Sequence, residues 1–227
     1  MKKDKTNNQQ VLTAWEANAN AWIHSLEKNE IKSRLVLTNL AITNAILEVQ
    51  PKTILDAGCG EGWLGKTMEG HGIKVDGFDG VKVLVDNANK KNNGDYYVLS
   101  YHEVRNGKKQ LTAMYDAIVF NFALFEKEKV KPLLERLKNQ LKPKGFFIIQ
   151  TISEQNNLFA SRSENGWMLE DWKSMKIKFP APFKWYYRTD SEWRNLFNEM
   201  GASKVSAKQN FHQETREAFS IIYTIQI

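Results

Sequence analysis

The fold class of this chain is decided by the stretch Ile54-Leu55-Asp56-Ala57-Gly58-Cys59-Gly60-Glu61-Gly62. It begins as a short apolar run of the kind that forms a buried strand, reaches a carboxylate, and then opens into three glycines at alternate positions. A junction between a strand and a glycine-rich turn is where an α/β protein lets a ligand approach its backbone. We therefore expect a binding site directly after this strand.

The spacing of the glycines bears on which ligand this site takes. Dinucleotide-binding folds use G-x-G-x-x-G, in which the third glycine allows close packing of a helix whose N-terminus faces the pyrophosphate. In this chain Trp63 occupies the position of that third glycine, and Asp56 stands two residues before the first one. A carboxylate there would repel a pyrophosphate, but it suits the ammonium of an amino-acid moiety, which needs hydrogen-bond acceptors.

Strand and helix patterns alternate along the chain beyond this junction. A helical pattern at 130–141, for example, lies between two apolar strand patterns. Repeated strand, helix, strand units predict an α/β protein with a largely parallel sheet and helices on both faces. The predicted strands of this region cover residues 53–57, 73–78, 96–100, 117–120 and 146–151.

The flanks of this alternating region predict the domain organisation. Two helical patterns precede the first strand and predict an N-terminal helical cap over residues 1–50, ahead of a main domain over residues 51–227. Residues 153–190 break the rhythm, with three tryptophans and no clean period, and we expect them to form an insertion that acts as a lid. The remaining helices and strands are predicted at 9–28, 31–49, 189–201, 203–211 and 218–227.

The composition is that of an ordinary globular protein. Of the 227 residues 42% are apolar and 26% are charged, which suits one large domain. The single cysteine, Cys59, excludes an internal disulfide, and its place among glycines favours a buried packing role over a nucleophile. The net charge of +6 permits nucleic-acid binding without requiring it. Residues 1–8 are polar and no apolar run approaches membrane-spanning length, so we expect a cytoplasmic protein without a membrane partner.

The glycine stretch resembles motif I of the class I S-adenosylmethionine (SAM) dependent methyltransferases. About twenty residues later, Gly77-Phe78-Asp79-Gly80 is similar to the acidic strand end of this family, and residues 142–147 resemble the turn before its fifth strand. The resemblance runs from about residue 50 to residue 151, and the flanking Trp15–Trp22 and Tyr186–Thr189 segments are similar to small-molecule members. It implies a Rossmann-like, mostly parallel seven-stranded sheet with an antiparallel last strand, SAM as cofactor and S-adenosylhomocysteine (SAH) as product.

The resemblance also implies which residues hold the cofactor. Asp79 is expected to accept hydrogen bonds from both ribose hydroxyls, the alternative being a helix N-cap. Where the family often has an acid beside the adenine, this chain has Ser100 and Tyr101, which we expect to bind the adenine edge and to stack on the ring. Asn121 and Phe122 are expected to line the point where the methyl donor and the acceptor meet. The implied cofactor-binding residues are Asp56, Gly58, Cys59, Gly60, Asp79, Gly80, Ser100, Tyr101, Asn121, Phe122 and Trp22.

Other side chains have a functional and a structural interpretation. Trp22 either folds over the cofactor or packs in the core, and Arg34 is expected to be a solvated arginine rather than a ligand of the cofactor carboxylate. Methyl transfer is an in-line displacement that needs a general base only if the acceptor must lose a proton. His212 is the first candidate for that catalytic role and His102 the second, although either could be an ordinary surface histidine. No cluster of potential ligands has metal-binding spacing, so we expect no metal.

A nucleic-acid methyltransferase is the main alternative to a small-molecule enzyme, because basic and aromatic residues are interleaved in the insertion. Against it, Phe122-Ala123-Leu124 stands where adenine-N6 enzymes carry a Pro-Pro-aromatic motif, and acidic residues balance most of the positive charge. A lid over a small, planar acceptor accounts for the aromatic residues more simply. A SAM-binding protein without catalysis and a nicotinamide oxidoreductase are further alternatives. The basic residues concerned are Lys173, Lys176, Lys178, Lys184 and Arg188.

Overall fold

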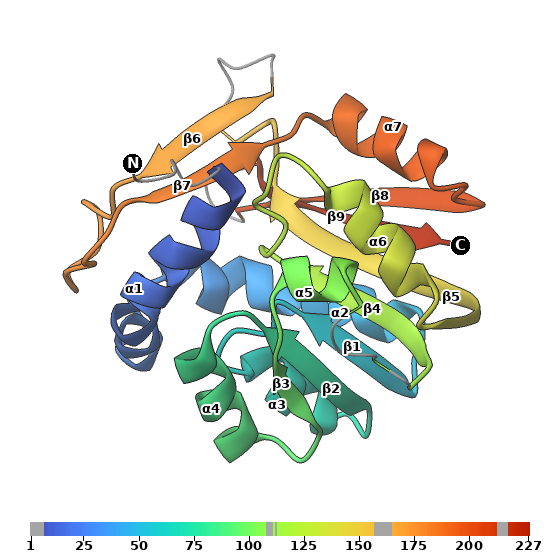
Figure 1. The fold of residues 1–227 in the computed structure, drawn as a ribbon, viewed down its shortest axis with the longest axis horizontal. Helices are drawn as coiled ribbons and strands as arrows, with labels where there is room; N and C mark the ends of the chain where they lie inside the picture. The colour runs from blue at the N-terminus through green and yellow to red at the C-terminus, as the bar shows by residue number, and fades with distance from the viewer. Residues whose placement is uncertain (1–6, 108–110, 112, 157–164, 213–217) are drawn as a thin grey trace.

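A computed structural model describes residues 7–107, 111, 113–156, 165–212 and 218–227 of the chain. A seven-stranded sheet forms its centre (Figure 1), built from β1 (Thr53–Ala57), β2 (Lys74–Asp79), β3 (Tyr96–Val98), β4 (Tyr115–Asn121), β5 (Leu141–Ile152), β8 (Lys204–Phe211) and β9 (Ala218–Gln226). The strand order is β3-β2-β1-β4-β5-β9-β8. β1 to β5 are parallel, and β9 is antiparallel to both of its neighbours. The predicted sheet, mostly parallel with an antiparallel last strand, is confirmed.

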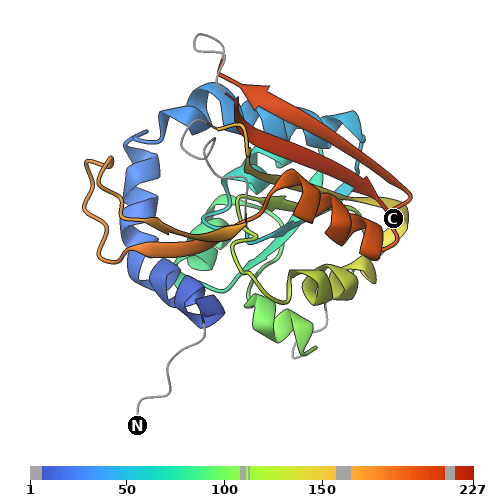
Figure 2. The same ribbon diagram turned by 90° about the horizontal axis from the view of Figure 1, so that it is seen from above.

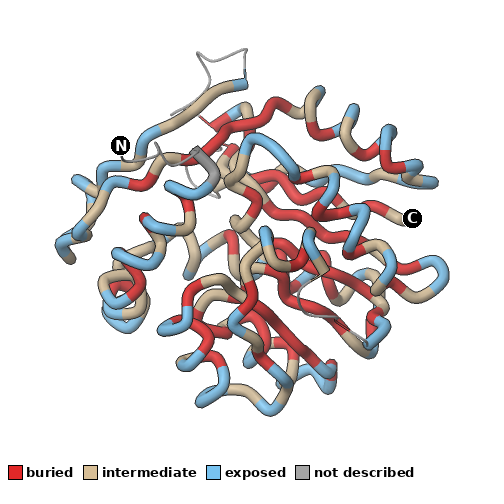
Figure 3. The backbone as a smooth tube through the Cα atoms, viewed as in Figure 1, coloured by how far each residue is buried: buried red, intermediate tan, exposed pale blue. Residues whose placement is uncertain are grey.

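Both faces of the central strands are buried, which is why these strands read as continuous apolar runs in the sequence. In β1, Leu55 and Ala57 belong to one core cluster, whereas Ile54 belongs to the cluster on the opposite face. Figure 3 shows the buried backbone running along the central strands, with the exposed segments mostly in the surrounding helices and loops. Two separate cores therefore cover the two faces of one sheet.

Helices cover both faces of the sheet, as predicted (Figure 1). In α6, the buried side chains recur at every third or fourth position, so one stripe of the helix packs on the sheet. Within the described ranges, none of the helices combines the length and the apolar character needed to cross a lipid bilayer. One face carries α2 (Asn39–Glu48), α3 (Trp63–Glu69) and α4 (Lys82–Lys91), and the other carries α5 (Tyr101–Arg105), α6 (Val130–Lys138) and α7 (Asp190–Glu199).

The helical segments before the sheet are α1 (Asn7–Glu27) and a π-helix, η1 (Arg34–Thr38), that leads into α2. The single helix expected at 31–49 is therefore divided into two forms of helix. Ile42 and Ile46 of α2 are completely buried in the core cluster of one sheet face. The helix α2 is thus an integral part of that core, and the division of the chain at residue 50 stays a prediction.

The prediction for the start of the fifth strand was wrong. β5 begins at Leu141, whereas the sequence pattern predicts a helix through residue 141 and a strand from residue 146. Leu141 pairs with Tyr115 of β4, and a register shift between Tyr115 and Ala117 accommodates the extra residues before Phe146. Pairing with β4 extends β5 over a Lys-Pro-Lys-Gly segment whose local sequence is typical of a turn. A local sequence pattern contains no information about such pairing.

The insertion contains an antiparallel hairpin of β6 (Gly166–Glu170) and β7 (Phe183–Tyr187), which lies across α1 (Figure 2). The Asn18 side chain of α1 donates to the carbonyl of Ala181 (2.8 Å) and accepts from its N–H (3.0 Å). The Glu30 carboxylate accepts hydrogen bonds from two backbone N–H groups in the same hairpin loop. We call α1 together with this hairpin the cover; its action as a lid stays a prediction.

Candidate functional site

The turn after β1 is built from glycines in the left-handed region of backbone conformation. Gly58, Gly60 and Gly62 have φ values of 80°, 54° and 84°, which L residues with a side chain rarely adopt. A Cβ added at Gly58 would lie 2.6 Å from the Tyr101 hydroxyl and 2.7 Å from the Ala123 Cβ. At Gly60 an added Cβ would have nothing within 4 Å. Gly58 is therefore required for internal packing, whereas the backbone at Gly60 faces open space.

Asp79 joins this glycine loop to the turn after β2. Its carboxylate accepts a hydrogen bond from the Gly60 N–H (3.1 Å) and another from the Val81 N–H (2.9 Å). The N-cap of α4 is Val81, so Asp79 does not occupy the cap position that was its alternative role. A carboxylate oxygen has more than one lone pair, and Asp79 therefore keeps the capacity to accept further hydrogen bonds.

Three carboxyl groups converge on the loop, those of Asp56, Glu61 and Asp79. Burial, together with the negative charges of Glu61 and Asp79, raises the pKa of Asp56 to about 8. Burial also raises the pKa of Asp79 to about 6, although backbone hydrogen bonds from Val81 and Gly60 oppose the shift. The same surroundings raise the pKa of the buried Cys59 thiol well above its usual value, which keeps Cys59 a neutral packing residue. A positive charge placed beside these carboxyl groups would favour their ionised form.

Arg34 brings a positive charge to the edge of this acidic loop. Its guanidinium lies 3.9 Å from the Glu61 carboxylate, 5.0 Å from the ring of Trp63 and 5.6 Å from the ring of Trp22. The Arg34 side chain is only 14% exposed, so the solvated arginine expected from the sequence was wrong. Its pKa is lowered by burial, with Glu61 opposing the shift. Trp22 of α1 therefore reaches the glycine loop through Arg34.

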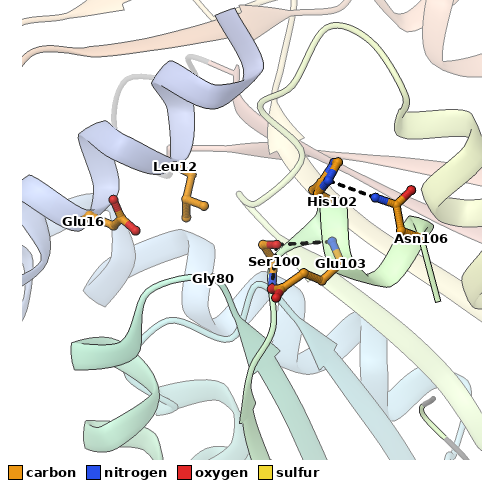
Figure 4. A pocket seen from close by; sticks show the side chains of 7 residues that line it. All are labelled: Leu12, Glu16, Gly80, Ser100, His102, Glu103 and Asn106. Atoms are coloured by element: carbon orange, nitrogen blue, oxygen red, sulfur yellow. Dashed lines mark hydrogen bonds between the residues drawn. The ribbon is translucent and has the colours of Figure 1, made fainter. Parts of the chain in front are cut away.

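A cleft of about 460 Å³ lies between α1 and α5, beside the end of β2 (Figure 4). Ser100 caps α5 by accepting from the Glu103 N–H, and the Glu103 carboxylate in turn accepts from the Ser100 N–H. Two of the predicted cofactor-binding residues, Gly80 and Ser100, line this cleft together with His102, the second candidate base. The sequence contains no signal for the α1 residues on its other wall, because only the docking of α1 places them there. The cleft is lined by Leu12, Glu16, Gly80, Ser100, His102, Glu103 and Asn106.

Tyr101, the residue after Ser100, is directed into the core instead of lining this cleft. Its ring packs edge-on against Phe78 and Phe120, and its hydroxyl contacts the carbonyl oxygens of Ala57 (3.2 Å) and Ala123 (3.3 Å). The hydroxyl thus lies beneath Gly58. This placement supports the glycine loop from below and gives no support to the predicted stacking of Tyr101 on an adenine.

The end of β4 turns sharply at the predicted meeting point of donor and acceptor. Phe122 has a positive φ of 50°, and its N–H donates to the carbonyl of Gln150 on β5. The side-chain oxygen of Asn121 is buried and has no hydrogen-bond partner within the described part of the chain. Asn121 and Phe122 therefore lie at the same sheet edge as the glycine loop, and their contact with a cofactor stays a prediction.

The two candidate bases lie in different parts of the molecule. His102 lines the cleft and its Nε2 lies 2.9 Å from the Asn106 side-chain nitrogen. His212 follows the edge strand β8, which is four strands from β1; at about 4.8 Å per strand the separation is about 19 Å. The catalytic role of His212 stays a prediction. Within residues whose placement is described, no group of three or more His, Cys, Asp or Glu side chains could hold a metal ion.

Arg188 fastens the cover to the loop after β4. Its side chain is 1% exposed and lies between the rings of Tyr186 (5.0 Å) and Trp193 (5.1 Å). One guanidinium nitrogen donates to the carbonyls of Glu126 (2.5 Å) and Lys127 (2.6 Å). Burial lowers the pKa of Arg188, with the Glu192 carboxylate as the main opposing influence. Arg188 is therefore a buried residue with a structural role.

Aromatic side chains fill the space between α1, the hairpin and the loop after β4. The ring centroids of Trp15 and Trp22 are 5.3 Å apart, and Trp15 lies 5.0 Å from Phe183. Phe183 also lies 5.0 Å from Phe125, whose carbonyl accepts a hydrogen bond from the Tyr186 N–H of β7. The cover is thus held by aromatic packing on one side and by backbone hydrogen bonds on the other.

Comparison with known proteins identifies relatives in sequence. A family model described as a methyltransferase domain matches residues 14–207, most of the chain. The ubiquinone biosynthesis O-methyltransferase of Rickettsia canadensis (strain McKiel) is 25% identical over 123 residues, which are 52% of this chain and 50% of that protein. The chain therefore spans half the length of this relative.

Solved structures share the fold. A SAM-dependent methyltransferase from Mesorhizobium loti aligns with a TM-score of 0.59 at 17% identity, over 81% of this chain and 96% of that one. The 1,6-didemethyltoxoflavin-N1-methyltransferase of Burkholderia thailandensis, solved with 1,6-didemethyltoxoflavin and SAH, aligns with a TM-score of 0.63 at 14% identity, over 92% and 86% of the two chains. Because the family match covers most of its length, the chain belongs to the methyltransferase domain family, and it shares the fold of these solved SAM-dependent methyltransferases.

Proposed function

We propose that this protein transfers a methyl group from SAM to a small, planar acceptor and releases SAH. The observation that carries the proposal is the convergence of the carboxyl groups of Asp56, Glu61 and Asp79 on an open glycine loop, where burial raises the pKa values of the two aspartates. The pyrophosphate of a dinucleotide would be repelled there. The ammonium and sulfonium groups of SAM would instead stabilise the ionised carboxylates.

Each polar part of SAM has a matching residue in this arrangement. Asp79 accepts hydrogen bonds from the ribose hydroxyls, in addition to those from the backbone. Asp56 accepts from the ammonium, and the guanidinium of Arg34 pairs with the carboxylate of the aminoacyl group. Gly60 leaves the space for the ligand to approach the backbone. The residues after β2 and β3, Gly80 and Ser100, face the adenine across the cleft.

The protein contributes alignment and exclusion of water to the reaction. When bound, SAM supplies a methyl group activated by a sulfonium. Asn121 and Phe122 at the end of β4 position the acceptor, and the aromatic side chains of the cover keep water from the site. A base such as His212 or His102 is required only if the acceptor reaches the site with the proton of its attacking atom still bound.

Two basic residues of the insertion favour a small acceptor over nucleic acid, because both already contact groups of this chain. Arg188, one of the five proposed to track phosphates, is 1% exposed and binds two carbonyls of its own chain. Lys173 forms an ion pair with Asp171 at 2.5 Å. The curated relative is named for ubiquinone biosynthesis, and one structural neighbour holds 1,6-didemethyltoxoflavin, so small planar molecules are the acceptors to test first.

Isothermal titration calorimetry with SAH tests the cofactor site. The wild-type protein is expected to bind SAH, and Asp79→Ala to bind it at least about tenfold more weakly, because hydrogen bonds to a charged group are lost. Asp86→Ala is the matched control, since Asp86 is 48% exposed on α4 and pairs with Lys82. Absence of heat from SAH with the wild-type protein, or an unchanged affinity in Asp79→Ala, would contradict the proposal.

Transfer of label from methyl-labelled SAM identifies the acceptor class. The protein is incubated in parallel with a panel of phenols, quinols and nitrogen heterocycles, with tRNA, and with DNA. Label in a small-molecule product supports the proposal. Label in nucleic acid at a rate that falls with added salt would favour the alternative acceptor. SAH binding without a labelled product from the panel, the nucleic acids or a cell extract would favour a non-catalytic binder.

A further inference from the structure

The adenine end of the proposed cofactor site lacks the acidic residue that related enzymes often carry after the third strand. Ser100 stands at that position, and the next carboxylate along the chain is that of Glu103. The Glu103 carboxylate accepts from the Ser100 N–H (2.9 Å) and from the Ser100 hydroxyl (2.8 Å). The Glu103 carboxylate is therefore engaged in the N-terminal cap of α5. A carboxylate that recognises the adenine base has to come from another element.

The α1 helix supplies such a carboxylate. A Cβ built at Gly80 would lie 2.7 Å from the Leu12 side chain, so α1 passes directly over the turn after β2. Glu16 lies one helical turn after Leu12 and lines the same cleft, opposite Ser100 (Figure 4). Within the described residues, no hydrogen bond or ion pair engages the Glu16 carboxylate.

We propose that Glu16 accepts a hydrogen bond from the 6-amino group of the cofactor's adenine and thereby sets the specificity of the site for a 6-aminopurine. The inference rests on the proposed function, because a ribose held by Asp79 directs the base past Gly80 and into the cleft that Glu16 lines. An ionised carboxylate only accepts hydrogen bonds, and an exocyclic amino group donates them. A 6-oxo group also only accepts, so a Glu16 carboxylate that faces the 6-position would disfavour a 6-oxopurine, whose donor on this edge is the neighbouring ring N1–H.

Calorimetric titration with two ligands tests this role. SAH is compared with S-inosylhomocysteine, in which a carbonyl oxygen replaces the 6-amino group. The wild-type protein is expected to bind SAH about tenfold more tightly. In Glu16→Ala this ratio should fall below about threefold. Glu16→Gln should lower SAH affinity and raise S-inosylhomocysteine affinity, because an amide can donate to the 6-oxo group.

A control variant and two different negative results distinguish a failure of the role of Glu16 from a failure of the proposed function. Glu27→Gln changes a glutamate on the same helix that is 65% exposed and lies outside the cleft, so it should preserve the ratio of the wild-type protein. If SAH fails to bind the wild-type protein, the proposed function itself fails. If SAH binds but the ratio is the same in Glu16→Ala, Glu16→Gln and the wild-type protein, only the role of Glu16 is overturned.

Discussion

Two glycines of the same loop, Gly58 and Gly60, have different roles although both have a positive φ. Gly58 is packed against the Tyr101 hydroxyl and the Ala123 side chain, so its missing side chain is required by the fold. Gly60 has open space in front of it and donates its N–H to Asp79, so no contact within the protein requires its missing side chain, and we propose that a ligand does. At the scale of single residues, we therefore expect one glycine of the motif to determine stability and the other to determine binding.

The substitutions Gly58→Ala and Gly60→Ala should separate these two roles. Gly58→Ala is expected to lower the free energy of unfolding by about 3 kcal/mol, because backbone strain adds to a steric clash. Gly60→Ala should cost only about 1 kcal/mol of strain, yet weaken SAH binding by more than about tenfold because its Cβ enters the ligand's space. Urea unfolding and calorimetry measure the two effects. Equal losses of stability in both variants would contradict this assignment.

The buried carboxyl of Asp56 should make stability depend on pH. Its pKa rises from 3.8 to about 8 on folding, so the folded protein holds this proton more tightly than the unfolded chain. The stabilisation from Asp56 is complete below the unfolded pKa and is lost as the pH rises towards 8. Relative to Asp56→Asn, the wild-type melting temperature should therefore fall between pH 5 and pH 8. A melting-temperature difference independent of pH would contradict the raised pKa.

Binding of SAH should counteract the loss of stability that ionisation of Asp56 causes as the pH rises. The ammonium of SAH stabilises the ionised form of Asp56, so binding at pH 7 is expected to release a proton. Calorimetry in two buffers of different ionisation enthalpy detects that release. The Asp56→Asn variant is the control, because it has no proton to release at this position.

At the scale of elements, α1 and the hairpin of β6 and β7 act as one unit because Asn18 joins them. Asn18 is 1% exposed, and both functions of its amide, donor and acceptor, are satisfied by the backbone of Ala181. Trp172 of the hairpin loop also donates its indole N–H to the Ala181 carbonyl. The opposite side of the cover is held by Arg188 and by the hydrogen bond from Tyr186 to Phe125.

Replacing Asn18 should loosen the cover without unfolding the sheet. In Asn18→Ala the N–H of Ala181 loses its side-chain acceptor, which is expected to cost about 2 kcal/mol locally. Amide hydrogen exchange should increase in α1 and in residues 171–182, while that of β1 and β4 stays at the wild-type level. Asn20→Ala, at an exposed position of the same helix, is the control and should leave all four segments unchanged. Faster exchange throughout the sheet would show that Asn18 stabilises the whole fold.

At the scale of the whole molecule, the parallel sheet brings distant residues to one edge. Asp56, Asp79, Ser100 and Asn121 lie at or just beyond the carboxyl ends of β1, β2, β3 and β4, which are adjacent in the sheet order. Parallel neighbours place these ends together, so residues spread over more than sixty positions share one edge of the sheet. The edge strand β8 leads to His212 on the far side of the same sheet.

Local patterns predicted the parts of the fold that depend on local order. The glycine loop and Asp79 were recognisable because each follows a strand directly. The helix predicted at 189–201 was recognisable from its own periodicity, and in the structure Thr189 caps this helix, α7, by accepting from the Glu192 N–H. The early start of β5 at Leu141 could not be predicted, because it depends on pairing with Tyr115. The inward direction of Tyr101 was missed for a similar reason: its partners, Phe78 and Phe120, come from two other strands.

The sequence by itself determined the wound α/β sheet, the position of the glycine loop and the presence of acidic residues beside it, because hydrophobic periodicity, glycine spacing and the order of strands are all local in the chain. Only the tertiary structure decided that Arg34 lies half-buried against the rings of Trp22 and Trp63 and that Glu16 lines the cleft beside Gly80. Both depend on how the N-terminal helices dock on the sheet. That docking is set by contacts between residues far apart in the chain, as between Asn18 and Ala181, which no local pattern records.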